Sequence, residues 1–243
     1  MSQQLPSEHI KFYRDHALFH DNAKIVRSGA DIPTHNLARF FEAGRFVTEN
    51  KKDILAVTQA QHRELIPVAP FSQRIADFIK SHHYTLMPNS DFDKAMYECL
   101  QPRQTGTEHG IGNSLALKLG DLHWAKEAHS IEIYKGLTMV GAVIFLHSET
   151  NGKVTSLASF GKDPKGEDEL AAYVATQCAL HHNKLSLHDA IRPTHHTRQL
   201  GGGLVSLRDH LMFENIAKQN RLVLTPIWYN LPLVEYAKPL ING

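Results

Sequence analysis

Cysteine is scarce in this 243-residue sequence, which contains only Cys99 and Cys178. Two cysteines are far too few for a disulfide scaffold, and such a low count is typical of proteins from a reducing compartment. Long apolar runs are also missing, because no stretch approaches the roughly 20 residues that a helix needs to cross a bilayer. Residues 1–9 lack the basic start and apolar centre of a signal peptide. We therefore expect a cytoplasmic protein without a membrane span.

An excess of charge of either sign is absent as well. The 26 Lys and Arg residues nearly balance the 25 Asp and Glu residues, and the formal net charge is +1. This balance argues against nucleic-acid binding by bulk charge alone, although a local basic patch is compatible with it. Nucleic acid is therefore not favoured as a partner, but it is not excluded.

Histidine, in contrast, is abundant, with 17 residues. Three pairs are adjacent in sequence, and adjacent side chains diverge on a helix or a strand, so a pair does not make a metal site. His16 and His20 have the four-residue spacing of a metal-binding helix, but the Glu of a zinc-hydrolase motif is missing. We expect no metal.

The spacing of apolar residues predicts a chain that mixes helices and strands. Helices are expected at 35–50, 72–82, 92–100, 167–180 and 204–220. Strands are expected at 24–27, 115–119, 131–134, 139–146, 154–160, 185–191 and 221–228. Because no repeat or linker interrupts the sequence, we predict a single domain over 1–243. Within it, 35–110 would be a helical elaboration and 111–243 a sheet-rich core.

Three glycines, Gly201 to Gly203, separate the strand predicted at 185–191 from the helix predicted at 204–220. A helix that begins there leaves its first N–H groups unpaired at a partly positive end. Glycines let the backbone approach an anion closely, and Arg198 adds a fork of donors. The spacing is neither that of a P-loop nor that of the dinucleotide fingerprint. We interpret the cluster as a phosphate or pyrophosphate site; a flexible loop before a helix is the alternative.

The spacing Arg198-x-x-Gly201-x-Gly203 resembles the pyrophosphate motif of the GNAT superfamily of N-acyltransferases, and the strand, helix and strand around it follow the order in that family. The resemblance implies an α+β fold with a mixed, mainly antiparallel sheet flanked by helices. It also implies acetyl-CoA or another acyl-CoA as co-substrate and partner, with an amine as acceptor. The residues that it implies for coenzyme A binding are Leu187, Ala190, Ile191, Arg198, Gln199, Leu200, Gly201, Gly202, Gly203 and Leu204.

Direct transfer of an acyl group to an amine requires a base and an acid. His188 and Asp189 are the candidates for the base, and strand alternation directs only one of them toward the cleft. The resemblance implies a tyrosine as the acid, for which Tyr236 is the candidate and Tyr229 the alternative. A packing role stays open for each of these side chains.

Two other functions fit the sequence. The first is acyl transfer to a protein or a nucleic acid, with 35–110 as the docking surface. The second is a binding module for coenzyme A or phosphate without catalysis, because residues 231–243 are too few for the last helix and two strands of the GNAT fold. A homodimer in which a partner's strand completes the sheet is compatible with the same short end.

Overall fold

The computed structural model describes residues 24–28, 32–49, 54–101, 111–147, 153–185, 187–219 and 231–242. The elements in chain order are β1 (Lys24–Ser28), α2 (Thr34–Glu42), β2 (Arg45–Glu49), β3 (Leu55–Gln59), β4 (His62–Pro67), α3 (Gln73–Ser81), β5 (Thr85–Pro88), α4 (Phe92–Leu100), α5 (Asn113–Trp124), β6 (Ala128–Lys135), β7 (Thr138–His147), β8 (Lys153–Gly161), α6 (Glu167–His182), β9 (Leu187–Ile191), α7 (His195–Gln199), β10 (Gly203–Ser206), α8 (Leu207–Gln219), β11 (Leu231–Pro232) and α9 (Leu233–Ile241).

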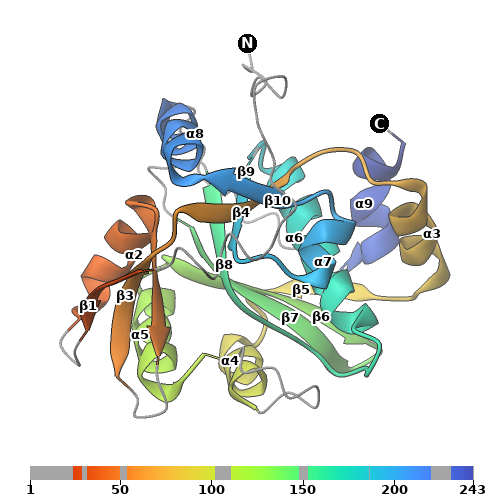
Figure 1. The fold of residues 1–243 in the computed structure, drawn as a ribbon. Helices are drawn as coiled ribbons and strands as arrows, with labels where there is room; N and C mark the ends of the chain where they lie inside the picture. The colour runs from red at the N-terminus through yellow and green to blue at the C-terminus, as the bar shows by residue number, and fades with distance from the viewer. Residues whose placement is uncertain are drawn as a thin grey trace.

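A large sheet of eight strands forms the centre of the molecule (Figure 1), in the order β10-β4-β9-β8-β7-β6-β5-β11. Its neighbouring strands are antiparallel except for β8 and β9, which are parallel. Parallel neighbours need a crossover connection, which α6 provides. The predicted α+β class, with a mainly antiparallel sheet flanked by helices, is confirmed in this general form.

Each face of the large sheet buries a separate hydrophobic core. Strand β7 shows why: Val143 and Phe145 pack with α3, α6 and α9 on one face, whereas Ala142 and Ile144 pack with α4 and α5 on the other. Side chains that alternate along a strand point to opposite faces, so an almost wholly apolar strand must be covered on both. None of the described helices has the length and apolarity that a membrane crossing demands.

A small sheet of three strands, in the order β1-β3-β2, lies beside the large one (Figure 1). Only two residues separate the end of β3 from the start of β4, so the chain passes directly from the small sheet into the large one. Helices α2 and α5 both pack against β2. This connection holds β2 close to the end of the large sheet where β4 and β9 pair.

Several predicted elements agree with the structure, including the strands β6, β7, β8 and β9 and the helices α3, α4 and α6. The strand predicted at 115–119 is wrong, because these residues belong to α5, in which Leu115, Leu119 and Leu122 share one buried face. The helix predicted at 35–50 ends at Glu42, and β2 follows. Gly44, at φ 70°, makes the turn between them, a conformation that glycine adopts at little cost.

The helix predicted at 204–220 is also corrected. The glycine cluster leads into strand β10, and α8 begins only at Leu207. The strand predicted at 221–228 and Tyr229 lie outside the described residues. Helix α9 then packs on α3 and α6, so residues after 230 cover the large sheet with a helix.

Candidate functional site

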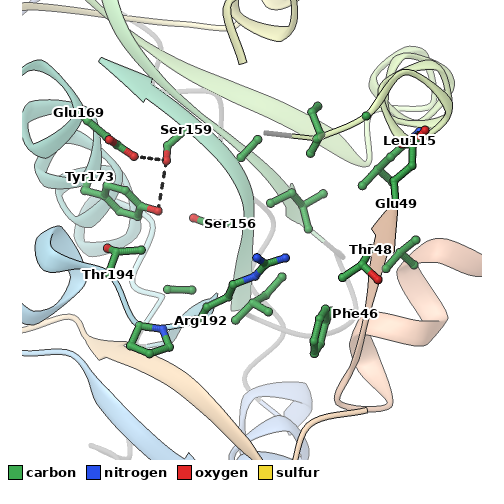
Figure 2. A pocket seen from close by; sticks show the side chains of 18 residues that line it. Phe46, Thr48, Glu49, Leu115, Ser156, Ser159, Glu169, Tyr173, Arg192 and Thr194 are labelled. Carbon is green, nitrogen blue, oxygen red and sulfur yellow. Dashed lines mark hydrogen bonds between the residues drawn. The ribbon is translucent and has the colours of Figure 1, made fainter. Parts of the chain in front are cut away.

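A cavity of about 290 Å³ lies between the small and the large sheet (Figure 2). It is lined by β2 of the small sheet, by β8 and β9 of the large sheet, and by the helices α5 and α6. Its wall consists of Phe46, Val47, Thr48, Glu49, Ile111, Gly112, Leu115, Ser156, Leu157, Ala158, Ser159, Glu169, Tyr173, Ala190, Ile191, Arg192, Pro193 and Thr194. The volume is at the lower end of the range for small-molecule pockets.

The cavity exists because β8 and β9 separate. They pair over only three positions, from Lys153 opposite Leu187 to Thr155 opposite Asp189. The next four residues of β8 line the cavity, and a bulge at Leu157 interrupts their pairing with β7. Ligands of α/β sheets commonly bind beyond the carboxyl ends of parallel strands, and the cavity occupies that position here.

Ile191, at the end of β9, has an unusual backbone conformation in the cavity wall. Its φ is 63°, which is a genuine outlier for a β-branched residue. The N–H of Arg192 donates to the carbonyl of Ala190 at 2.6 Å, so Ile191 is the central residue of a tight three-residue turn. Such turns cost about 1–3 kcal/mol each and cluster at functional sites. The wall is therefore held in a strained conformation by its surroundings.

Asp189 supplies much of that support from behind the wall. Its carboxylate accepts the N–H of Ile191 at 2.9 Å and is ion-paired with Arg63 at 2.5 Å. Lys153 lies 3.6 Å and His210 3.2 Å from the same carboxylate. Burial opposes the charge, but Arg63, His210 and Lys153 outweigh it and hold the pKa of Asp189 well below its ordinary value. Asp189 is thus an ionised, fully paired carboxylate.

One side of the cavity wall is polar. Ser159 donates to Glu169 at 2.5 Å and lies 3.5 Å from the hydroxyl of Tyr173, as Figure 2 shows. The second oxygen of Glu169 lies 3.4 Å from His196 of α7. A carboxylate and two hydroxyl groups therefore face a ligand on this side.

The opposite side of the wall is largely apolar and comes from β2 and α5. Phe46, Val47 and Leu115 are buried there. The guanidinium of Arg192 lies 5.9 Å from the ring of Phe46, within cation–π range. Burial lowers the pKa of Arg192 below its ordinary value. Because an arginine guanidinium is not deprotonated in proteins, the side chain stays cationic at neutral pH.

Glu49 fixes this apolar side by capping α5. Its two carboxylate oxygens accept the N–H groups of Ser114 and Leu115, each at 2.9 Å. A Cβ at Gly112 would lie 2.3 Å from the Glu49 carboxyl carbon, so only glycine permits this approach. The cap joins β2 of the small sheet to α5, and both elements line the cavity.

His188 and Asp189, the two candidates for the catalytic base, are not part of the cavity wall and lie behind it. His188 is fully buried: its Nε2 is 2.5 Å from the Ser156 hydroxyl and its Nδ1 is 2.6 Å from the Gln177 amide nitrogen. Burial lowers the pKa of His188 to about 4. Ser156, through which His188 reaches the cavity, is itself in the wall.

Tyr236 is not part of the cavity wall and lies in the core of α3, α6 and α9. Its ring stacks on His182 at 4.2 Å, and burial raises its pKa to about 12. Of the ten residues predicted to bind coenzyme A, Ala190 and Ile191 line the cavity, and Leu187 does not. No group of three His, Cys, Asp or Glu side chains able to hold a metal occurs within the described ranges, which do not include His16 and His20.

The glycine cluster does not begin a helix; it ends one. Gly201, at φ 83°, follows α7, and its N–H donates to the carbonyl of Arg198 at 3.0 Å. The N–H of Gly202 donates to the carbonyl of Thr197 at 2.9 Å. These N–H groups are occupied, and the end of a helix carries partial negative charge. The glycines follow α7 and lead into β10, so the pyrophosphate cradle predicted at the start of a helix is wrong.

Most of the cavity wall has no local signal in the sequence. Ser156, Glu169 and Arg192 come from different elements, and Glu49 and Leu115 are 66 residues apart. The useful clue was His188, which pointed to β9 but not to its partner on β8.

Comparison with known proteins identifies the segment that contains most of this site. The family model described as leucyl/phenylalanyl-tRNA protein transferase matches residues 67–213. A leucyl/phenylalanyl-tRNA–protein transferase of Pseudomonas entomophila is 26% identical over 200 residues, which cover 79% of this chain and 85% of that protein. The enzyme of the same name from Hydrogenovibrio crunogenus is 26% identical over 221 residues, or 88% and 82% of the two chains. That from Shewanella denitrificans is 24% identical over 130 residues, or 53% and 55%.

These matches overturn the GNAT resemblance and what followed from it. The assignment to an acyl-CoA-dependent enzyme is wrong, as are acetyl-CoA or another acyl-CoA as co-substrate and partner, because the matched proteins are named for transfer from tRNA. The low expectation for nucleic acid as a partner is corrected as well. That expectation rested on the net charge of +1. A net charge is a sum over the whole chain and does not reveal where individual cations lie.

Proposed function

The chain belongs to the leucyl/phenylalanyl-tRNA protein transferase family, and from that premise we propose that it moves a leucyl or phenylalanyl group from tRNA to an amino group of a protein. The expectation of an enzyme of the N-acyltransferase kind is confirmed by the family. The observation that carries the proposal is the cavity at the separated ends of β8 and β9, which has one apolar and one polar side.

The apolar side matches the side chain of the donor. Leucyl and phenylalanyl groups are bulky and uncharged, and Phe46, Val47 and Leu115 offer them a largely apolar surface. Burying such a side chain contributes about 1.5–3 kcal/mol. A charged aminoacyl group would instead lose hydration against these apolar side chains. The cavity therefore favours large apolar donors.

Two arginines are placed to receive the nucleic-acid part of the donor. Arg192 lies in the cavity wall, and Arg198 is exposed on α7, which begins just after the wall residue Thr194. Phosphate contacts from such side chains orient a nucleic acid without reading its sequence. We propose that this edge receives the 3′ end of the tRNA, and the reaction then belongs in the cytoplasm, where aminoacyl-tRNA is made.

The acceptor is best an α-amino group. The ordinary pKa of a protein N-terminus is about 7.7–8.0, whereas that of lysine is about 10.4. At pH 7.5 the fraction of amine that is neutral and nucleophilic is therefore much larger for the N-terminus than for lysine. The amine nitrogen attacks the ester carbonyl, a C–N bond forms and the bond to the ribose oxygen breaks. The proton lost by the amine ends on that oxygen. Glu169 and the hydroxyls beside it face this reaction from the polar side.

The test is transfer of radiolabelled leucine from leucyl-tRNA to a peptide with a free N-terminus. We expect transfer to the free peptide and none to its N-acetylated form, with phenylalanyl-tRNA also active and aspartyl-tRNA inactive. An Ala158→Phe variant, which fills part of the cavity from β8, should raise KM for leucyl-tRNA at least about 10-fold because the lost burial is worth more than 1.4 kcal/mol. If the folded wild type transfers neither leucine nor phenylalanine from its tRNA, the proposal is contradicted.

A further inference from the structure

Ser156 is the only hydroxyl residue of β8 that reaches both the cavity and His188 among the described contacts. Its Oγ lies in the cavity wall and is 2.5 Å from Nε2 of His188. In Figure 2 Ser156 lies between the Ser159–Tyr173 pair and Arg192, in the middle of the wall. His188 lies behind it, fully buried, with its ring centroid 6.0 Å from that of Tyr173.

The hydrogen bonds of His188 determine which way Ser156 donates. The Gln177 nitrogen, 2.6 Å from Nδ1, belongs to an amide NH₂ group, which only donates. In this orientation of the amide, whose oxygen has no hydrogen-bond partner among the described residues, Nδ1 accepts. Because His188 is buried and neutral, its single proton is then on Nε2, and Nε2 donates to Ser156. The hydroxyl proton of Ser156 is left to point elsewhere, and the cavity lies on its open side.

We propose that Gln177, His188 and Ser156 form a chain of hydrogen bonds that presents the Ser156 hydroxyl as a donor to the carbonyl oxygen of the aminoacyl ester. This role rests on the proposed function. The carbonyl oxygen gains negative charge when the amine attacks, and a donor already fixed in place stabilises that charge more than it stabilises the ground state. Ser156 keeps its proton throughout, and His188 acts as a positioning residue. This differs from the base role expected of His188 from the sequence.

Consecutive hydrogen bonds polarise one another in a buried setting. Each donor in the chain also restricts the next one, so the Ser156 hydroxyl has little freedom to rotate. The nearby Ser159 provides a contrast. It lines the same cavity on the same strand, but its hydroxyl donates to Glu169 at 2.5 Å. Its proton is engaged, so Ser159 is a matched comparison that lacks the proposed role.

The kinetic test compares Ser156→Ala, Ser156→Thr and Ser159→Ala in leucyl transfer. Loss of a fixed donor to a developing oxyanion typically lowers kcat by about 100-fold or more. We expect that fall for Ser156→Ala with a nearly unchanged KM for leucyl-tRNA, and recovery of most of kcat in Ser156→Thr. Ser159→Ala should lower kcat far less. Equal kcat values for the wild type and Ser156→Ala overturn the proposal.

A second measurement tests the chain without depending on turnover. Nitrogen-15 NMR of the imidazole of His188 in the wild type distinguishes the two neutral tautomers. We expect Nε2 protonated and Nδ1 unprotonated between pH 6 and 8. The kinetic counterpart is His188→Phe, which keeps the hydroxyl of Ser156 and should lose kcat to a similar degree as Ser156→Ala. A proton on Nδ1 reverses the direction of donation and overturns the proposal.

The two proposals fail in different ways. A wild-type protein that transfers no leucyl group overturns the proposed function. A wild-type protein that transfers leucine and is matched by Ser156→Ala leaves the proposed function intact and overturns only the role of Ser156. If circular dichroism shows that Ser156→Ala is unfolded, the tautomer of His188 in the wild type decides whether Ser156 has the proposed role.

Discussion

The carboxylate of Asp189 accepts the backbone N–H of Ile191 at 2.9 Å, and Ile191 has a φ of 63°. A side chain two residues earlier thus stabilises a backbone conformation that a β-branched residue rarely adopts. The same carboxylate is fixed from the other side by Arg63 on β4. The wall of the cavity therefore depends on a pairing between β4 and β9 that is remote from any ligand.

Replacing Asp189 by Asn tests this dependence. The variant retains an acceptor for Ile191 but leaves Arg63 and Lys153 buried without a counter-charge, which typically costs about 3–5 kcal/mol. We expect a loss of that size in the free energy of unfolding, measured in urea at pH 7. Glu235→Gln, which breaks an exposed ion pair with Lys238, should cost less than about 1 kcal/mol. Equal losses in the two variants would refute the supporting role.

Acidification should weaken the same cluster. The pKa of Asp189 is held well below its ordinary value when folded, so its stabilising contribution is complete above the unfolded pKa of about 3.9 and is lost as pH falls toward the folded value. We expect the wild type to lose stability below pH 4 more steeply than Asp189→Asn. If the free energy of unfolding of the two proteins changed in parallel over pH 2–5, Asp189 would not be the source of the acid dependence.

Glu64 should show the opposite dependence on pH. Burial raises its pKa to about 7, while its hydrogen bond from Thr197 at 3.0 Å and the charge of Arg198 oppose the rise. The folded protein therefore keeps a proton that the unfolded chain loses above about pH 4.5, and stability falls as pH rises from there to 7 by on the order of 1 kcal/mol per pH unit. Glu64→Gln should remove this slope and raise Tm at pH 8, with little change at pH 4. A slope that survives in the variant contradicts the assignment.

The sequence predicted the elements whose pattern is local. Strands β6 and β7 follow from two apolar runs on either side of Lys135–Gly136, and α6 follows from acidic residues at its start. The strand wrongly expected at 115–119 shows the limit of such patterns. A short apolar run is ambiguous until its partners are known, and Leu115 and Leu119 share a helical face against the core.

The site was less accessible from sequence because its groups meet only after folding. Ser156 and His188 come together because β8 and β9 are parallel neighbours, which no local pattern records. The glycine cluster misled for a related reason. Glycine is favoured at the end of a helix as well as in loops that bind anions, and the short α7 before it was not recognised. Only its hydrogen bonds show which end of a helix it occupies.

The exposed Arg198 should contribute to tRNA binding through charge. A side chain that contacts one phosphate releases about one counterion, so Arg198→Ala should reduce the slope of log K against log salt concentration by about 1. Fluorescence anisotropy with labelled leucyl-tRNA between 50 and 300 mM KCl measures this slope. Lys238→Ala, an exposed cation on α9, is the matched control and should leave it unchanged. Identical slopes for the two variants would exclude a phosphate contact at Arg198.

Glu49 should link the stability of α5 to binding of the donor. Its carboxylate accepts two N–H groups at the start of that helix, and Leu115, whose N–H is one of them, lines the cavity. Loss of a helix cap costs about 0.5–2 kcal/mol. We expect Glu49→Ala to lower the free energy of unfolding by that amount and to raise KM for leucyl-tRNA, and Glu49→Gln to be intermediate in both because it keeps one acceptor.

The control for Glu49 is a cap of another helix. Asp91 accepts the N–H of Lys94 at 3.1 Å at the start of α4, and it is not part of the cavity wall. Asp91→Ala should therefore cost a similar amount of stability while KM stays at the wild-type value. The comparison separates a general loss of stability from a change in the cavity. If both variants raise KM equally, the effect of Glu49 is global, and the joining of β2 to α5 does not set the width of the cavity.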